Sequence, residues 1–530
     1  MKKVTPRTRL LSALAACATV AGVVVSAQFS GPSSSQTAYV LPVLPAVKTS
    51  SILTVGDAIG GYKMVGIPDG LGAFDNGNGT FTLLMNHELG STVGVPRAHG
   101  AKGAFVSKWI IDKSTLSVVS GSDLMQKVFL WDTANQRSAT TPSAVAFQRF
   151  CSADLPEISA FYNAKTGRGT QERIFMHGEE GGTGMQMATV VTGLHAGESF
   201  HLGKFNLTTN GSGLTGVGAW ENALANPYPQ DKTLVVANSD GGTGIMTNAV
   251  AVYVGTKQTN GTEADKAGLT NGTLSFINVA GNAAELADTT ARTTNIVSGT
   301  RFYLSGTSAT TFSRPEDGAW NPRNPSEYYF VTTDRLDDVT DGLGSQIGRT
   351  RLWRLTFDDL ANPFLGGSID LLIDNRVVNG QRVNMFDNIT VNPQSGQIVL
   401  LEDVGGAAHN GKVWLYDPST DALVQVAKHD EARFGNLTKA ATAPYTNDEE
   451  ASGVIDMSSI LGPGYYVTSD QAHYATTTEL VEGGQLLLAR IPLVTNKEQC
   501  KSDGFSSYTR NDGSTFKNQG DCIQYANTGK

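Results

Sequence analysis

Apolar runs that end on a carboxylate recur along this chain. In residues 314–334, Glu316 is followed by a short apolar step, a turn rich in Pro and Asn, and the run YYFVTT, which leads to Asp334. Turn residues between two apolar segments indicate a β-hairpin, and the aromatic and β-branched run is typical of a buried strand. The two carboxylates are therefore expected at the same end of the hairpin.

The same plan recurs five more times, in residues 69–88, 157–179, 221–240, 387–402 and 450–470. Segments beside these units predict further, outward strands at residues 105–111, 250–255, 351–357, 412–416 and 485–491. Internal repetition on this scale indicates a propeller. Six units predict an all-β fold, a six-bladed β-propeller over residues 49–493. The alternative is an all-β protein in which hairpins with acidic ends occur without this symmetry.

Residues 257–313 depart from the rhythm, because they are rich in Thr, Asn, Gly and Ala. We expect an insertion over one mouth of the propeller there, where long loops often carry function. The composition agrees with an all-β fold, since Gly is abundant at 59 residues and only 17% of residues are charged. A net charge of -9 argues against nucleic acid or an anionic membrane surface as a partner.

The N-terminus predicts export. Four cationic residues precede an apolar segment over residues 10–25, and Val25, Ser26 and Ala27 fit a cleavage site, so residues 1–27 are expected to be a signal peptide. A rival interpretation takes residues 14–17 as a lipoprotein box with Cys17 as the lipidated residue, but the apolar segment continues past it. No later segment is apolar over the length that spans a bilayer. A secreted protein is the prediction.

Residues 28–48 are expected to be a linker or a first edge strand, and residues 494–530 a separate polar tail. The tail carries Cys500 and Cys522, which outside the cytoplasm predict a disulfide that closes it. Cys151 then has no partner. It is either a small buried apolar residue or a soft metal ligand.

In a propeller the inner strands run toward the mouths of a central channel, so acids repeated at their ends converge there. Such a carboxylate ring cannot stay ionised without cations, so either metals bind or several pKa values rise. Metal binding is the simpler outcome, and calcium takes six to eight oxygen ligands. The candidate metal ligands are Glu88, Glu179, Glu180, Glu221, Asp240, Glu316, Asp317, Asp387, Glu402, Glu450, Asp470 and Cys151. Glu180 and Glu316 are the candidate catalytic acids. Arg314 either contacts a phosphate or forms a salt bridge that holds the turn.

Several runs resemble the PhoX alkaline phosphatases: GTFTLLMNHE (79–88), MHGEE (176–180), WENA (220–223), RPEDG (314–318), MFDNI (385–389) and DEEASG (448–453). The resemblance implies a six-bladed propeller with calcium and iron at the channel mouth, cleaving phosphate monoesters and some diesters outside the cell. Glu180, Glu221 and Glu316 match acidic positions of that family. Gly178 stands where the family's iron-binding cysteine is expected, and Cys151 is only a loose substitute, so the resemblance supports calcium more than iron.

Two other functions stay open. One is a non-catalytic calcium-binding propeller that binds a partner, and the other is a calcium-dependent lactonase or related ester hydrolase. A phosphatase needs several metal ions and a cationic contact for the phosphate of a small-molecule substrate, whereas a lactonase needs one calcium ion and an apolar pocket. A monomer is favoured.

Overall fold

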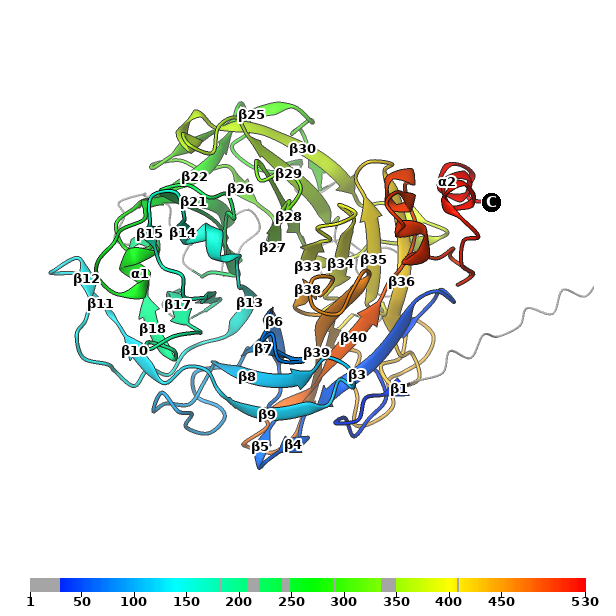
Figure 1. Ribbon diagram of the computed structural model, residues 1–530, viewed down its shortest axis with the longest axis horizontal. Coiled ribbons are helices and arrows are strands. Elements are labelled where there is room, and N and C mark those ends of the chain that lie inside the picture. The colour runs from blue at the N-terminus through cyan, green and yellow to red at the C-terminus, as the bar shows by residue number, and fades with distance from the viewer. Residues whose placement is uncertain are drawn as a thin grey trace, which may run out of the picture.

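The computed structural model describes residues 29–181, 184–206, 219–240, 248–288, 292–334, 349–407 and 409–530. The predicted leader, residues 1–27 with Cys17, lies outside them. The described chain forms a ring of six β-sheet blades around a central channel, seen end-on in Figure 1. Inner strands contact one another in chain order, and β38 contacts β6, which closes the ring.

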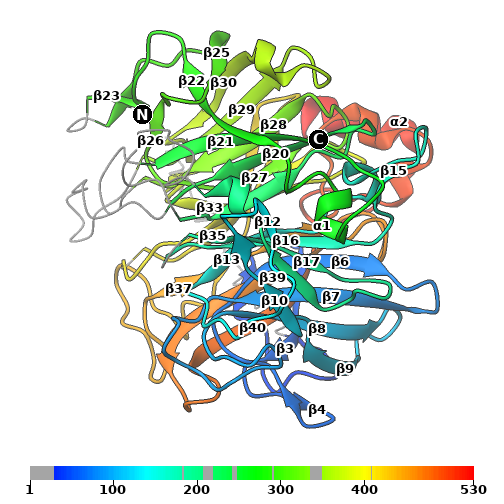
Figure 2. The ribbon, with the colours of Figure 1, turned by 90° about the vertical axis from the view of Figure 1, so that its left-hand side faces the viewer.

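Blades 1 and 2 each pair four strands from the channel outwards. Figure 2 shows those of blade 1 stacked in order from β6 to β9. Blade 1 contains β6 (Pro68–Asp75), β7 (Thr80–His87), β8 (Phe105–Asp112) and β9 (Val118–Asp123). Blade 2 contains β13 (Phe150–Asp154), β16 (Ile174–Glu179), β17 (Gln186–Val190) and β18 (Glu198–His201), with β10 (Lys127–Phe129) at its outer edge.

Blades 3 and 4 are joined into one continuous sheet. Blade 3 contains β19 (Asn222–Ala225), β20 (Lys232–Asn238), β21 (Asn248–Thr256) and β22 (Thr273–Val279). Blade 4 contains β27 (Pro315–Trp320), β28 (Glu327–Thr332), β29 (Arg351–Phe357) and β30 (Gly367–Asp374). β25 (Thr300–Ser305) pairs with both β22 and β30, and β26 (Thr311–Phe312) pairs with β21. The predicted insertion over residues 257–313 is thus partly wrong, because it supplies the outermost strand of blade 3 and the bridge to blade 4.

Blades 5 and 6 take strands from both ends of the chain. Blade 5 contains β33 (Phe386–Val391), β34 (Ile398–Glu402), β35 (Lys412–Asp417) and β36 (Ala422–His429), with β2 (Val40–Pro42) on its edge. Blade 6 contains β37 (Glu449–Glu450), β38 (Val454–Asp456), β39 (Tyr465–Ala475), β40 (Glu482–Arg490), β3 (Lys48–Thr54) and β1 (Phe29–Ser30). Pairing of β3 with β40 joins the two ends of the propeller.

Smaller elements decorate the blades. The short hairpins are β4–β5 (Ala58–Ile59, Tyr62–Lys63), β11–β12 (Trp131–Asp132, Arg137–Ser138), β14–β15 (Tyr162–Asn163, Arg168–Gly169), β23–β24 (Leu286–Asp288, Thr293–Thr294) and β31–β32 (Val377–Val378, Gln381–Arg382). The helical turns are η1 (Ile158–Ala160), η2 (Gly203–Phe205), η4 (Pro363–Leu365) and α1 (Glu263–Lys266).

The core lies between blades. Along β20, Leu234 and Val236 pack into the apolar cluster shared with blade 4, while Val235 and Ala237 pack into the cluster shared with blade 2. Successive side chains of a strand point to opposite faces. Because both faces of an inner strand are buried, the sequence of such a strand is continuously apolar rather than alternating.

The C-terminal tail packs against turns of blade 5. It contains η5 (Lys497–Cys500), η6 (Gly504–Ser506) and α2 (Gln519–Thr528), and a disulfide joins Cys500 to Cys522. Asn496 Nδ2 donates to Asp417 Oδ2 at 2.7 Å, and Gln397 Nε2 donates to Thr495 Oγ1 at 2.7 Å. The prediction of a six-bladed propeller with a disulfide-closed tail is confirmed. Among the described residues no helix is long and apolar enough to cross a membrane.

Candidate functional site

A β-bulge opens the inner strands of four blades at the same mouth of the channel. In β27 the pairing moves from Pro315–Thr332 to Gly318–Phe330, so two residues on the inner strand oppose one on its neighbour. The same shift occurs in β6, β13 and β33. A bulge bends a strand and re-aims its side chains. The first bulged residues are Asp69, Cys151, Glu316 and Asp387.

The residue that precedes each of these strands has a left-handed backbone. The φ angles are 50° at Ile67, 50° at Arg149, 57° at Arg314 and 40° at Met385. Such angles are uncommon for residues other than glycine, and they persist only where the surrounding structure imposes them. The bulge and the residue of left-handed conformation before it are therefore a local geometry shared by four inner strands at this mouth.

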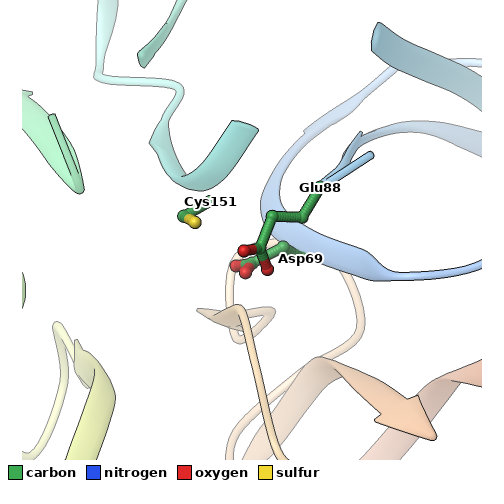
Figure 3. Close-up of side chains that lie close together, drawn as sticks. All are labelled: Asp69, Glu88 and Cys151. Atoms are coloured by element: carbon green, nitrogen blue, oxygen red, sulfur yellow. The ribbon is translucent and has the colours of Figure 1, made fainter. Parts of the chain in front are cut away.

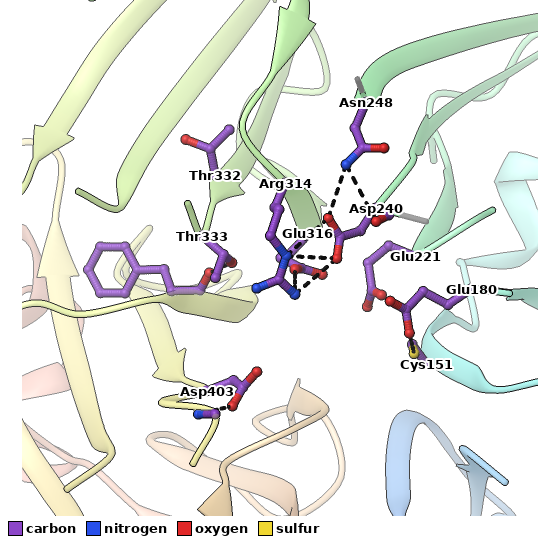
Figure 4. Close-up of polar contacts among 12 residues, drawn as sticks. Cys151, Glu180, Glu221, Asp240, Asn248, Arg314, Glu316, Thr332, Thr333 and Asp403 are labelled. Carbon is purple, nitrogen blue, oxygen red and sulfur yellow. Dashed lines mark hydrogen bonds and ion pairs between the residues drawn. The ribbon is translucent and has the colours of Figure 1, made fainter. Parts of the chain in front are cut away.

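Nine side chains of the described residues meet at this mouth, and we call them the mouth cluster. They form four overlapping groups in which the potential ligand atoms lie within 4.8 Å of one another. Figure 3 shows the first group, and Figure 4 shows Cys151, Glu180 and Glu221 of the second. The members are Asp69, Glu88, Cys151, Glu180, Glu221, Glu316, Asp387, Asp403 and Glu450.

The cluster fits cations. Gln471 Nε2 donates to Glu88 Oε2 at 2.8 Å, to Asp69 Oδ2 at 3.1 Å and to Glu450 Oε1 at 3.2 Å, which ties blades 1 and 6 together. Asp69 Oδ1 and Gln471 Oε1 are buried and have no hydrogen-bond partner within the described parts of the chain. Oxygen donors suit hard cations such as calcium, and the Cys151 thiol adds one soft donor.

Burial and mutual repulsion raise the pKa values of the cluster acids. Burial, followed by the charges of Glu450 and Glu88, holds the pKa of Asp69 well above its usual range. Burial raises the pKa of Glu221 to about 7. Burial also raises the pKa of the Cys151 thiol, and neighbouring carboxylates add to the effect. Bound cations would reverse these shifts, because they stabilise the ionised forms.

Within the described chain, two arginines contact the cluster. Arg149 Nε lies 2.7 Å from Glu88 Oε1, and its Nη2 contacts Glu180. Arg314 Nη2 lies 2.9 Å from Asp240 Oδ2 and 2.7 Å from Glu316 Oε1, as Figure 4 shows. Their side chains are 43% and 28% exposed, so both guanidinium groups border solvent and the acids.

Below the cluster, polar side chains fill the channel. Ser152 Oγ donates to Glu221 Oε1 at 2.5 Å and accepts from Asn388 Nδ2 at 2.7 Å. Asp317 Oδ1 accepts from Asn222 Nδ2 at 2.5 Å, and its Oδ2 accepts from the backbone N–H of Ile389. Asp317, a predicted ligand, therefore lies in the channel and outside the mouth cluster.

Three more predicted ligands lie outside the cluster, because they face the interior of their blades. Glu179 accepts from the backbone N–H groups of Gln148 and Met185, Glu402 from Lys412 Nζ and Trp414 Nε1, and Asp470 Oδ2 lies 2.7 Å from His429 Nε2. The residues that face the mouth are the next ones, Glu180 and Asp403. Successive strand residues alternate between faces, so a one-residue slip exchanges the two sets.

Of the predicted site residues, the structure brings together Glu88, Cys151, Glu180, Glu221, Glu316, Asp387 and Glu450, with Arg314 and Asp240 beside them. Asp69 and Arg149 were missing from the predicted site residues, and Asp403 was expected in the carboxylate ring but was not among the candidate ligands. Both acids could have been found from the sequence, because Asp69 is the first residue of the first repeat and Asp403 directly follows Glu402. Arg149 precedes Phe150 and Cys151 as Arg314 precedes Pro315 and Glu316, but the second repeat was expected to begin at Glu157.

Comparisons with known proteins show the fold. No protein-family model and no curated protein sequence matches the chain. Among solved structures, PhoX of Pseudomonas fluorescens in complex with vanadate, a transition state analogue, is 11% identical with a TM-score of 0.54, covering 87% of this chain and 98% of that one. The GH93 α-L-arabinofuranosidase of Fusarium graminearum with arabinobiose is 9% identical with a TM-score of 0.39, covering 79% and 92%. The first likeness supports a PhoX-like propeller fold.

Proposed function

We propose that this chain is a metal-dependent hydrolase of phosphoric esters, with calcium as its main cation. The observation that carries the proposal is the meeting of four overlapping ligand groups with two partly exposed arginines at one channel mouth. A likeness of fold to PhoX, a protein whose structure holds a transition state analogue, supports the same class of reaction.

The cluster residues divide by chemistry. Glu221, Glu316 and Asp387 form a buried group that offers only oxygen, which suits calcium. The groups that contain Cys151 offer a thiol beside carboxylates, which suits a softer ion such as iron. When bound, such cations polarise the phosphoryl oxygens and offset the charge that develops in the transition state.

The arginines bind and orient the phosphate. A guanidinium group presents several N–H donors in a planar fork that matches two phosphoryl oxygens. Arg314 is held against Asp240 and Glu316, and Arg149 against Glu88 and Glu180. These contacts fix each side chain at the edge of the cluster, so little conformational entropy is lost when the ester binds.

The two guanidinium groups also separate this function from the alternatives. A lactone carries no charge that such groups would recognise, so they favour a phosphorylated small molecule over a lactone as substrate. We place the reaction outside the cytoplasm, because the predicted leader at residues 1–27 and the disulfide Cys500–Cys522 agree with export. The proposed acting unit is the monomer.

The test is hydrolysis of p-nitrophenyl phosphate and bis(p-nitrophenyl) phosphate by the purified protein at alkaline pH, with metal content counted on the same sample. We expect turnover of the monoester that a chelator abolishes and calcium restores. Bound calcium without turnover of either ester would overturn the proposal in favour of a non-catalytic calcium-binding propeller. Turnover of a lactone alone would favour the lactonase.

A further inference from the structure

The opposite mouth of the channel opens into a second cavity, which we call the far pocket. Its volume is about 440 Å³. All six inner strands contribute to its lining, from Leu71 on β6 to Ile455 on β38. Pockets of a few hundred cubic ångströms are the usual size for small organic ligands.

Three Asn-Pro turns make part of the rim rigid. Asn226, Asn321 and Asn392 each precede a proline that lines the far pocket. In each turn the Asn Oδ1 accepts a hydrogen bond from the backbone N–H two residues later, at distances of 2.9, 3.0 and 3.0 Å. Proline fixes its own φ and the Asn side chain holds the turn, so the far pocket is preformed.

The ionisable side chains that line the far pocket are acidic. Among the described residues, its lining contains four carboxylates, from Asp154, Glu157, Asp317 and Asp456, and no Lys, Arg or His. The Asp317 carboxylate already accepts hydrogen bonds from Asn222 Nδ2 and from two backbone N–H groups. The Asp456 carboxylate accepts hydrogen bonds from Ser458 and Asn392. The lining therefore favours a cationic ligand and disfavours an anionic one.

Asp154 is the carboxylate best placed to pair with a ligand. Its Oδ2 accepts one hydrogen bond, from the backbone N–H of Ala225 at 2.9 Å, and its Oδ1 has no hydrogen bond to any described residue. Burial raises the pKa of Asp154 to about 7, with a smaller contribution from Glu157. No cationic side chain in the described part of the chain lines the far pocket to offset that cost, so a bound cation would stabilise the carboxylate.

The remaining walls are apolar. Leu155, Leu224, Ile460 and the indole of Trp320 line the far pocket, and Trp320 Nε1 is already bonded to the carbonyl of Leu224. A metal ion held directly by the protein needs several oxygen ligands around it, which such walls do not offer. An apolar body beside an ammonium group would instead bury against them.

We propose that the far pocket binds a small organic cation, namely a primary ammonium group on an apolar body, with the ammonium paired to Asp154. This site is separate from the mouth cluster and does not depend on the hydrolysis proposed there. Four of the six strands, β6, β13, β27 and β33, carry residues of the mouth cluster near one end and line the far pocket near the other.

The test is calorimetric titration of the purified, calcium-loaded protein with 2-phenylethylammonium, and with 2-phenylethanol and phenylacetate as neutral and anionic controls. We expect saturable binding of one ammonium per chain, at least tenfold weaker binding of the alcohol and none of the acid. Equal binding of the alcohol would overturn the proposal, because the far pocket would then select apolar surface alone. Displacement of the amine by added calcium would overturn it in favour of a metal site.

A matched pair of variants locates the contact. Asp154→Asn should weaken binding of the amine at least tenfold, whereas Glu157→Gln, on the exposed rim, should change it less than threefold. Equal effects of the two substitutions would contradict the pairing with Asp154. The ligand series on the unaltered protein decides the proposal even where a variant does not fold.

Discussion

Arg149 and Arg314 occupy the same backbone position in blades 2 and 4. Each immediately precedes a bulged inner strand, with φ angles of 50° and 57°, and each guanidinium contacts two acids at the channel mouth. The equivalent positions in blades 1 and 5 hold Ile67 and Met385, so the two cations are not imposed by the repeat. Both are therefore expected to serve the site.

Replacing either arginine by Met should lower kcat/KM for the phosphate monoester. Hydrogen bonds to a charged group are worth about 1.5–3 kcal/mol, so we expect a loss of roughly tenfold to a hundredfold for each variant. The measurement is steady-state kinetics, with metal content counted on the same samples.

Arg301→Met is the matched control for these variants. Its side chain is 40% exposed and is paired with Asp358, and it stands on β25, which Figure 1 shows at the outer edge of the ring. We expect unchanged kinetics for it. Full activity in Arg149→Met and Arg314→Met with unchanged metal content would mean that these arginines only hold the carboxylates in place.

The adjacent residues Glu179 and Glu180 should respond differently to substitution by Gln. Glu180 belongs to the mouth cluster, whereas Glu179 accepts hydrogen bonds from the backbone N–H groups of Gln148 and Met185. We expect Glu180→Gln to reduce metal content and activity at least tenfold. Glu179→Gln should keep the metal but lower the free energy of unfolding by about 1–3 kcal/mol, because a backbone donor loses its charged acceptor. Metal analysis and denaturant unfolding distinguish the two; the same result for both would contradict the assignment of faces.

The repeats and several strands could be predicted from sequence because they depend on local pattern. The predicted strand at residues 351–357 coincides with β29, and turn residues mark the hairpins of blades 1, 4 and 5. Blade 2 was misread, since η1 and the hairpin β14–β15 lie between β13 and β16 and supply turn signals of their own. The inner strand that carries Cys151 was therefore missed.

The face of each carboxylate could not be predicted, because it depends on a single residue of register. Glu402 and Asp403 are both acidic, and only the position where β34 ends decides which of them reaches the mouth. A bulge shifts the register of the inner strand by one further residue, and nothing in the local sequence marks the position of the bulge. Closure of the ring by β3 on β40 is likewise a long-range pairing without a local signal.

Cys151→Ser should remove a soft ligand and leave the calcium sites intact. The Cys151 thiol lies 2.9 Å from Glu180 Oε2, and it is the free thiol of the described chain. We expect the variant to keep its calcium and to lose its transition metal. On cobalt substitution the unaltered protein should show a thiolate-to-metal charge-transfer band that the variant lacks. An identical spectrum in the two proteins would show that Cys151 does not bind the metal and is a buried apolar residue.

Removing the cations should make stability depend on pH in a direction fixed by the buried acids. Burial raises the pKa of Glu221 from 4.5 to about 7 and that of Asp317 from 3.8 to about 8. The folded chain thus holds protons that the unfolded chain has released, so this stabilisation is complete below the unfolded values and is lost as pH rises through 7 and 8. His429, with its pKa raised to about 9 beside Asp470, acts in the same direction.

We therefore expect the chelated protein to unfold at a lower temperature at about pH 8.5 than at about pH 6.5, with calcium restoring the midpoint at the higher pH. His87 and His177 oppose this trend only weakly, because burial lowers their folded pKa values to about 3 and each unfolded imidazole releases only about half a proton over this pH range. Glu221→Gln carries no charge at that position, so it should flatten the dependence. Thermal unfolding followed by circular dichroism checks this, and a midpoint that rises with pH in the chelated protein would show that the mouth carboxylates are ionised without a cation.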